Sequence, residues 1–187
     1  MDWLNNSKLK TNDLFFTPLS VAKECINMTP LEGVVLDAWR GDGAFYNNYG
    51  LEITEKCWAE ITENKDFMDW VEPVDWICSN PPYSLLKTHL PKVLKLCKKG
   101  FGLLLGSINL TTARLKLIAD AGFFVNRIHF INIDGFGLGT SVYIICSKII
   151  TNYITFNNTK YEMDGQPGID RKKNKQIYQQ KYRNRLK

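Results

Sequence analysis

The chain has 187 residues, of which 44% are hydrophobic and 23% charged, and its formal net charge at pH 7 is +5. These values are typical of a globular protein, and the length suits one domain with a full hydrophobic core. No apolar run could span a membrane and no signal peptide is recognisable, so we expect a cytoplasmic protein. The five cysteines include no Cys-x-x-Cys pair, so the sequence predicts no metal site.

Helices and strands are predicted in alternation along most of the chain. Helices are predicted at 18–28, briefly from 44, at 84–98 and at 111–121, and strands at 33–37, 57–61, 74–78, 101–106, 124–131 and 141–147. This alternation favours an α/β fold with a parallel sheet and helices on both faces. Because only a loop separates the last two strands, they should form a hairpin with an antiparallel final strand.

The first predicted strand ends in an acidic residue and continues directly into a glycine-rich loop. Asp37 is followed by Trp39, Gly41, Gly43 and Phe45. Two glycines at a spacing of two allow the backbone to turn sharply and to approach a ligand. The loop lacks both the Gly-Lys-Ser/Thr ending of a phosphate-binding loop and the third glycine of the dinucleotide fingerprint. An acid at the strand end would repel a pyrophosphate, so the loop suits a ligand that carries positive charge.

A second acidic residue follows at a position suited to a nucleoside. Glu60 lies near the end of the strand predicted at 57–61 and 19 residues after Gly41. That separation is close to the roughly 20-residue spacing at which an acid reaches ribose hydroxyls in nucleoside-binding sheets. Glu52 and Glu55 are alternatives, but they fall in the predicted connection between the strands.

The most informative segment is Asn80-Pro81-Pro82-Tyr83, which follows the apolar strand predicted at 74–78. Two consecutive prolines fix two φ angles and remove two backbone donors, and we expect the Pro81 carbonyl to be available to a ligand. The Asn80 side-chain oxygen is a second acceptor, and Tyr83 adds an aromatic ring. Two acceptors and a ring suit a planar substrate that carries an exocyclic amino group.

Asn-Pro-Pro-Tyr resembles the catalytic motif of S-adenosylmethionine-dependent methyltransferases that act on planar amino groups. The segment from Asp37 to Phe45 resembles the cofactor loop of that family, with Ala38 where a proline or cysteine is usual. Phe16-Thr17-Pro18 resembles the N-terminal motif of its DNA adenine-N6 members. The resemblance spans roughly residues 14–147. It implies a Rossmann-like methyltransferase fold, with a mostly parallel sheet of the seven-stranded type, an antiparallel last strand and helices on both faces.

The resemblance implies S-adenosylmethionine as cofactor and the N6 amino group of adenine in DNA as substrate. By this resemblance, Phe16 and Thr17 close over the methionyl carboxylate of the cofactor, and Asp66 accepts from the amino group of the cofactor's adenine. The implied catalytic residues are Asn80, Pro81, Pro82 and Tyr83. The implied cofactor-binding residues are Phe16, Thr17, Asp37, Trp39, Gly41, Gly43, Phe45, Glu60, Asp66, Phe67 and Asn80.

Three alternatives stay open. Asn-Pro-Pro-Tyr also occurs in enzymes that methylate RNA bases and in enzymes that methylate a glutamine amide in proteins. A non-catalytic nucleic-acid-binding subunit of a methyltransferase complex is the third. The Phe-Phe-Thr-Pro segment at 15–18 favours DNA, and the intact set of motifs favours an active enzyme.

Positive charge is concentrated near the C-terminal end. Residues 171–187 carry eight Lys and Arg and no acid, whereas residues 1–170 carry 16 basic and 19 acidic side chains, a net of −3. We therefore expect a single methyltransferase domain at 1–163 and a basic tail at 164–187 that contacts nucleic-acid phosphates. Target recognition would come from the loops at 107–114 and 132–140, from the small segment at 149–163, from the tail, or from a partner subunit or homodimer.

Overall fold

The structure, a computed structural model, describes residues 16–133, 140–151 and the backbone of 153–161. The tail predicted at 164–187 and most of the loop at 132–140 lie outside these residues. Among the described residues, no helix combines the length and the apolar composition needed to cross a bilayer.

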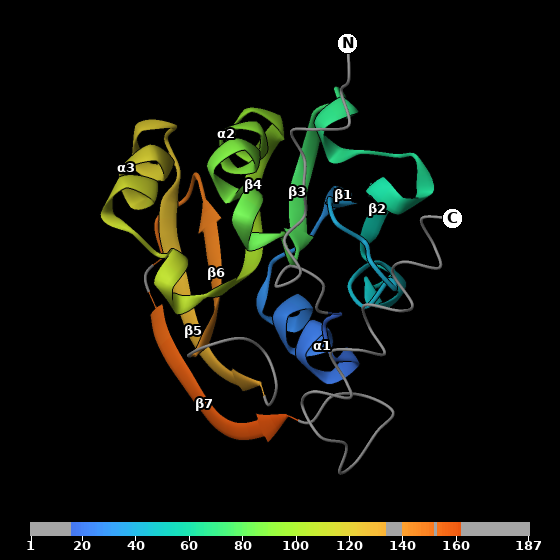
Figure 1. Cartoon of the computed structure of the whole chain (residues 1–187). Helices are drawn as coiled ribbons and strands as arrows, with labels where there is room; N and C mark the ends of the chain where they lie inside the picture. Colours follow the sequence, from blue (N-terminus) through green and yellow to red (C-terminus); the bar gives the residue numbers. More distant parts are fainter. Residues whose placement is uncertain (1–15, 134–139, 152, 162–187) are drawn as a thin grey trace.

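In the part of the chain that the structure describes, seven strands form a single sheet in the order β2-β1-β3-β4-β6-β5-β7. Figure 1 shows this order across the molecule, from β7 in orange on the left to β2 in cyan on the right. The strands are β1 (Gly33–Asp37), β2 (Ile53–Trp58), β3 (Val74–Ser79), β4 (Cys97–Gly106), β5 (Phe124–Ile133), β6 (Ser141–Ser147) and β7 (Tyr153–Tyr161). Only β6 runs antiparallel to its neighbours, β4 and β5, whereas the other pairs are parallel. The prediction of a mostly parallel α/β sheet of the methyltransferase type is confirmed.

Helices cover both faces of this sheet. Helix α1 (Leu19–Met28) packs on one face, and α2 (Leu86–Leu96) and α3 (Thr112–Asp120) contribute to the core on the other. Successive side chains of the central strand β4 alternate between the two cores, as strand geometry requires: Leu103 and Leu105 face α2, and Leu104 faces α1. Both cores are apolar, and the sheet therefore lies between two dry layers.

Three elements differ from the sequence-based prediction. Strand β2 ends at Trp58, so the strand predicted at 57–61 was misplaced: Glu55 and Lys56 lie exposed on an edge strand, which has no continuous apolar pattern. The helix predicted from 44 is only a 3-10 turn, η3 (Tyr46–Asn48), because Gly43 and the asparagines that follow are poor helix formers. Strand β7 was not predicted at all.

One glycine of β4 is required by close packing. A Cβ on Gly100 would lie 2.5 Å from the Trp76 ring and 2.6 Å from the backbone carbonyl oxygen of Cys146 on β6. Since a strand backbone cannot move aside freely, we expect Gly100→Ala to lower the free energy of unfolding by about 1–3 kcal/mol. Urea denaturation measures this effect. Gly50→Ala is the control, because a Cβ on the exposed Gly50 would meet nothing within 4 Å.

Candidate active site

The ends of β1, β3 and β4 meet at one edge of the sheet, because these strands are parallel neighbours. β1 ends at Asp37, β3 at Ser79 and β4 at Gly106. Ligands in open α/β sheets bind outside the carboxyl ends of the strands, where the loops converge. All the predicted site residues lie in or beside the segments at this edge.

Asp37 lies beneath the glycine loop. It is 0% exposed, its Oδ1 accepts from Ser79 Oγ at 2.5 Å, and its Oδ2 accepts from the Tyr46 backbone N–H at 3.1 Å. Burial raises the pKa of Asp37 from its ordinary 3.8 to about 7, and the hydrogen bonds from Ser79 and Tyr46 oppose the rise. The carboxylate thus ties the loop to β3. A direct contact between Asp37 and a cofactor stays a prediction.

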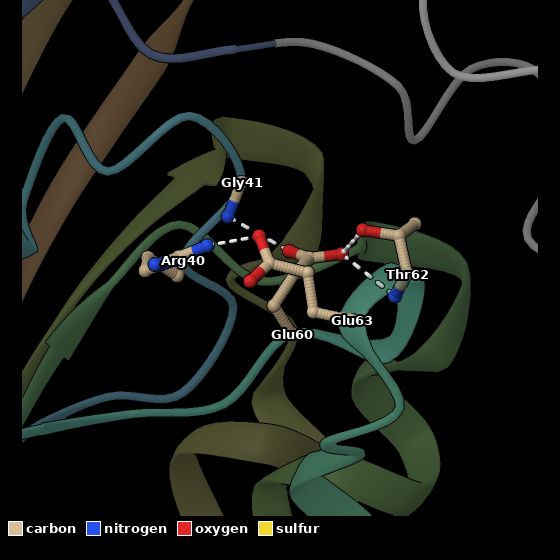
Figure 2. Close-up of polar contacts among 5 residues, drawn as sticks. All are labelled: Arg40, Gly41, Glu60, Thr62 and Glu63. Carbon is tan, nitrogen blue, oxygen red and sulfur yellow. Dashed lines mark hydrogen bonds and ion pairs between the residues drawn. The ribbon is translucent and has the colours of Figure 1, made fainter. Parts of the chain in front are cut away.

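Glu60 holds the glycine loop from its other side (Figure 2). Its Oε2 accepts from the Gly41 backbone N–H at 2.8 Å, and its Oε1 accepts from Thr62 Oγ1 at 2.6 Å and from Thr62 N–H at 3.1 Å. Gly41 and Gly43 have φ angles of 53° and 89°, which favour glycine. Because a carboxylate has about four acceptor positions, these three bonds leave Glu60 able to accept from a further hydroxyl.

A salt bridge lies next to Glu60. Arg40 pairs with Glu63, and the Arg40 guanidinium lies 4.0 Å from the centroid of the Trp58 ring. Figure 2 shows the Glu63 carboxylate beside that of Glu60, facing the glycine loop. The side chains of Glu60 and Glu63 therefore both connect the glycine loop with the 3-10 turn η4 (Ile61–Glu63).

The N-terminal motif connects the glycine loop with the Asn-Pro-Pro-Tyr segment. The Phe16 ring lies against Gly41, where an added Cβ would be 3.2 Å from Phe16 Cδ1. The next residue, Thr17, accepts at Oγ1 from Asn80 Nδ2 at 3.2 Å. Residues that are 63 positions apart in the chain therefore meet, as the predicted common site requires.

Asn80 presents an acceptor that the protein itself does not use. Its Oδ1 is buried and has no hydrogen-bond partner among the described residues. Pro81 is buried, and the Pro82 carbonyl accepts from Leu85 N–H at 3.0 Å, which supports the 3-10 turn η6 (Tyr83–Leu85). The Tyr83 ring lies over Gly106, with Cε2 3.4 Å from the position of a Cβ there. Buried acceptors are rarely left without a donor, and the Asn80 oxygen is therefore a candidate position for a ligand donor.

An aromatic cluster packs around Trp39 of the glycine loop. Trp39 donates from Nε1 to His89 Nδ1 at 3.1 Å and packs edge-on against Phe67, with ring centroids 4.9 Å apart. Burial lowers the pKa of His89, which favours the neutral ring that this bond needs. Asp66 accepts at Oδ1 from Met68 N–H at 2.9 Å and caps the 3-10 turn η5 (Phe67–Asp69).

Two of the predicted cofactor residues are core residues in the structure. Phe45 is 3% exposed and Phe67 1% exposed, and each packs in one of the two apolar cores. Their contact with a ligand stays a prediction. Conversely, sequence reasoning overlooked Ser79, Thr62 and His89. Ser79 and Thr62 lie within two residues of Asn80 and Glu60, which was a usable signal, whereas nothing in the sequence distinguishes His89.

No protein-family model matches the chain, and no curated protein matches it. Solved structures do. A Listeria monocytogenes protein assigned as a class I S-adenosylmethionine-dependent methyltransferase is 11% identical, with a TM-score of 0.54 over 100% of this chain and 74% of its own. The methyltransferase subunit of a type I restriction-modification system from Streptococcus thermophilus is 13% identical, with a TM-score of 0.55 over 91% of this chain.

The chain spans 53% of that Streptococcus subunit. At such identities the likeness concerns the fold. In both comparisons the matching structure is a methyltransferase, and the sheet here has a single antiparallel strand placed between parallel neighbours. The fold of this chain is therefore the Rossmann-like fold of class I S-adenosylmethionine-dependent methyltransferases.

Proposed function

We propose that this protein is an S-adenosylmethionine-dependent methyltransferase that acts on the N6 amino group of adenine in DNA. The observation that carries the proposal is the Asn80 Oδ1 acceptor, which is buried and unpartnered among the described residues. It follows a strand end, precedes two prolines and a tyrosine, and lies within one hydrogen bond of Thr17. An amino group on a planar ring is the donor that such an arrangement suits.

The residues around the glycine loop fit the proposed cofactor. Glu60 retains acceptor capacity for a ribose hydroxyl, and Gly41 keeps its backbone close to Phe16 without a side chain between them. The loop contains no lysine that would favour a phosphate, its Arg40 is paired with Glu63, and the Glu60 carboxylate beside it suits a ligand with positive charge. When bound, S-adenosylmethionine supplies an electrophilic methyl group on its sulfonium.

The proposed catalytic contribution of the chain is electrostatic and positional. The adenine amino lone pair is delocalised into the ring, which makes the nitrogen a weak nucleophile. Bonds from its two N–H groups to Asn80 Oδ1 and to the Pro81 carbonyl would favour a tetrahedral nitrogen and stabilise the charge that develops on it. Tyr83 would pack on the base, which must leave the duplex stack to reach these groups. A strong general base is not needed, because the positively charged methylated nitrogen is acidic and releases its extra proton to water.

DNA is favoured among the substrates for two reasons. The Phe-Thr-Pro motif, typical of DNA adenine-N6 enzymes, contacts both the glycine loop and Asn80 in the structure. The Streptococcus subunit that shares the fold belongs to a restriction-modification system. The basic residues at 171–187 or a partner subunit would contribute to target recognition.

Transfer of a tritiated methyl group from S-adenosylmethionine to DNA, RNA and protein tests the proposal. Digestion of the labelled product and mass spectrometry of its nucleosides identify the methylated atom. We expect N6-methyladenine from DNA. Label in RNA or in protein glutamine would show that the proposed substrate is wrong but that the protein is a methyltransferase. The absence of label from all three polymers would contradict the proposed activity.

Glu60 gives a test of the cofactor that needs no substrate. We expect Glu60→Ala to weaken S-adenosylmethionine binding by about 10–100-fold, since a hydrogen bond to a charged group contributes roughly 1.5–3 kcal/mol. Calorimetry measures the affinity. Glu63→Ala is the matched control on the same 3-10 turn, where an ion pair with Arg40 at side chains 21% and 42% exposed contributes only about 0–1 kcal/mol. Equal losses in both variants would contradict the assigned role of Glu60.

A further inference from the structure

We infer that Ser79 is a positioning residue that couples the glycine loop to the catalytic amide of Asn80. The inference rests on the proposed function and concerns a residue whose side chain is not accessible at the surface. Ser79 is the last residue of β3, immediately before Asn80, and is 0% exposed. Its hydroxyl therefore acts only on the protein around it.

The Ser79 hydroxyl has two partners among the described residues: Asp37, the last residue of β1, and Trp39 in the loop that follows. It donates to Asp37 Oδ1 at 2.5 Å and accepts from the Trp39 backbone N–H at 3.2 Å. A hydroxyl can do both at once, because it has one hydrogen and two lone pairs. The end of β1 and the start of the glycine loop are thus hydrogen-bonded to the last residue of β3, which directly precedes Asn80.

Asp37 extends this connection to the rest of the site. Its other carboxylate oxygen accepts from Tyr46 N–H at the far end of the loop, and its backbone carbonyl accepts from Ala59 N–H at 2.9 Å. Ala59 directly precedes Glu60, the proposed ribose ligand. The Asp37 carboxylate and the Ser79 hydroxyl thus join the ends of β1 and β3, and the Asp37 backbone carbonyl joins the end of β1 to the residue after β2. The position of Asn80 consequently depends on that of the cofactor loop.

Loss of the Ser79 hydroxyl would take a hydrogen-bond partner from each of two polar groups. The N–H of the half-buried Trp39 would lose its acceptor, and the buried Asp37 carboxylate would keep the donor from Tyr46 but lose that from Ser79. The same donor opposes the rise in the Asp37 pKa that burial causes. Three further ionisable groups interact with Asp37. Glu60, after β2, raises the pKa of Asp37, and Asp37 in turn raises the pKa values of Tyr49, after η3, and of Cys78 on β3.

The test compares Ser79→Ala with Ser79→Thr, which restores the hydroxyl. In Ser79→Ala we expect at least tenfold slower methyl transfer at saturating cofactor and substrate. We also expect the acid limb of its pH profile to move to higher pH, because Asp37 then ionises less readily. Ser79→Thr should recover most of the rate and the profile of the parent. Ser79→Cys, with a weaker donor of similar size, replaces Ser79→Ala if that variant does not fold.

Ser147→Ala is the control for a purely structural loss. Ser147 is also buried at a strand end, where it accepts from Asn126 and donates to Ile149 O, but it lies at the opposite edge of the sheet. We expect it to lower the unfolding midpoint without moving the pH profile. An equal shift in the profiles of Ser147→Ala and Ser79→Ala, or no shift in either, would overturn the inference.

Hydrogen exchange in the ligand-free protein separates this inference from the proposed function. We expect the Trp39 and Tyr46 amides to exchange at least tenfold faster in Ser79→Ala than in the parent. If the parent transfers no methyl group, the proposed function fails, and the exchange rates alone decide whether Ser79 orders the loop. Unchanged exchange of both amides would overturn the role of Ser79 even in an active enzyme.

Discussion

Asn80→Leu should lower the rate of methyl transfer by about 10²–10³-fold, the usual cost of removing one preorganised group that stabilises the transition state. Leucine has nearly the size of asparagine but no acceptor, so the substrate amino group would lose the buried Oδ1. Single-turnover transfer of a labelled methyl group measures the effect. Cofactor affinity should change far less, because Glu60 and the glycine loop are intact.

Two further variants make this prediction specific. Asn80→Asp keeps an acceptor oxygen at the position of Oδ1 and replaces the amide nitrogen by a second oxygen, to which the Thr17 hydroxyl can donate, so it should retain much more activity than Asn80→Leu. Asn64→Gly is the control for loss of an asparagine, since Asn64 is exposed and its φ of 56° suits glycine. Equal rates in the parent and in Asn80→Leu would exclude Asn80 from the chemistry.

Asp37→Asn should change how stability depends on pH. The carboxyl has a pKa of about 7 when folded against an ordinary 3.8, so between these values the folded state keeps a proton that the unfolded chain has lost. Stability therefore falls as pH rises through this range, by roughly 4 kcal/mol for three pKa units. Asparagine cannot ionise, so the variant should gain stability relative to the parent as the pH rises.

Urea denaturation of both proteins at pH 4, 5.5, 7 and 8 measures this difference. Taking the difference between the two proteins cancels the other ionisable groups. It should grow up to about pH 7 and then level off, because above that pH Asp37 is ionised in both states. Glu52→Gln, at an exposed position, provides the baseline. A difference that is constant from pH 4 to pH 7 would contradict the burial of an ionisable Asp37.

The sequence allowed the site to be located because its residues are set by short motifs at strand ends. A parallel sheet brings such ends together, so Gly41, Glu60 and Asn80 could be placed at one edge before their contacts were known. The contacts agree: Gly41 binds Glu60, and Thr17 binds Asn80. Motifs at strand ends, together with the parallel topology, were therefore sufficient to place these residues near one another.

The direction of individual side chains was beyond the sequence. Asp37 was expected to face a cationic ligand, but in the structure its oxygens face Ser79 and Tyr46 in the interior. Whether a strand-end residue points in or out depends on where the chain leaves the sheet, which is a tertiary property. The same holds for His89, whose position opposite Trp39 follows from the packing of α2. Strand β2 was misplaced because an edge strand tolerates Glu55 and Lys56 on its exposed surface.

The antiparallel strand β6 has a consequence for the order in which the strands pair during folding. β5 and β6 pair between neighbours in the chain, as in Ile131 with Ser141, whereas β1 and β3 pair across a crossover, as in Val35 with Trp76. Closing a long loop costs more chain entropy than closing a hairpin, so parallel pairing is the slower event in folding. We therefore expect β1 and β3, which end at Asp37 and directly before Asn80, to pair after the β5–β6 hairpin has formed. A ligand that spans Gly41 and Asn80 would then stabilise a late-formed part of the fold.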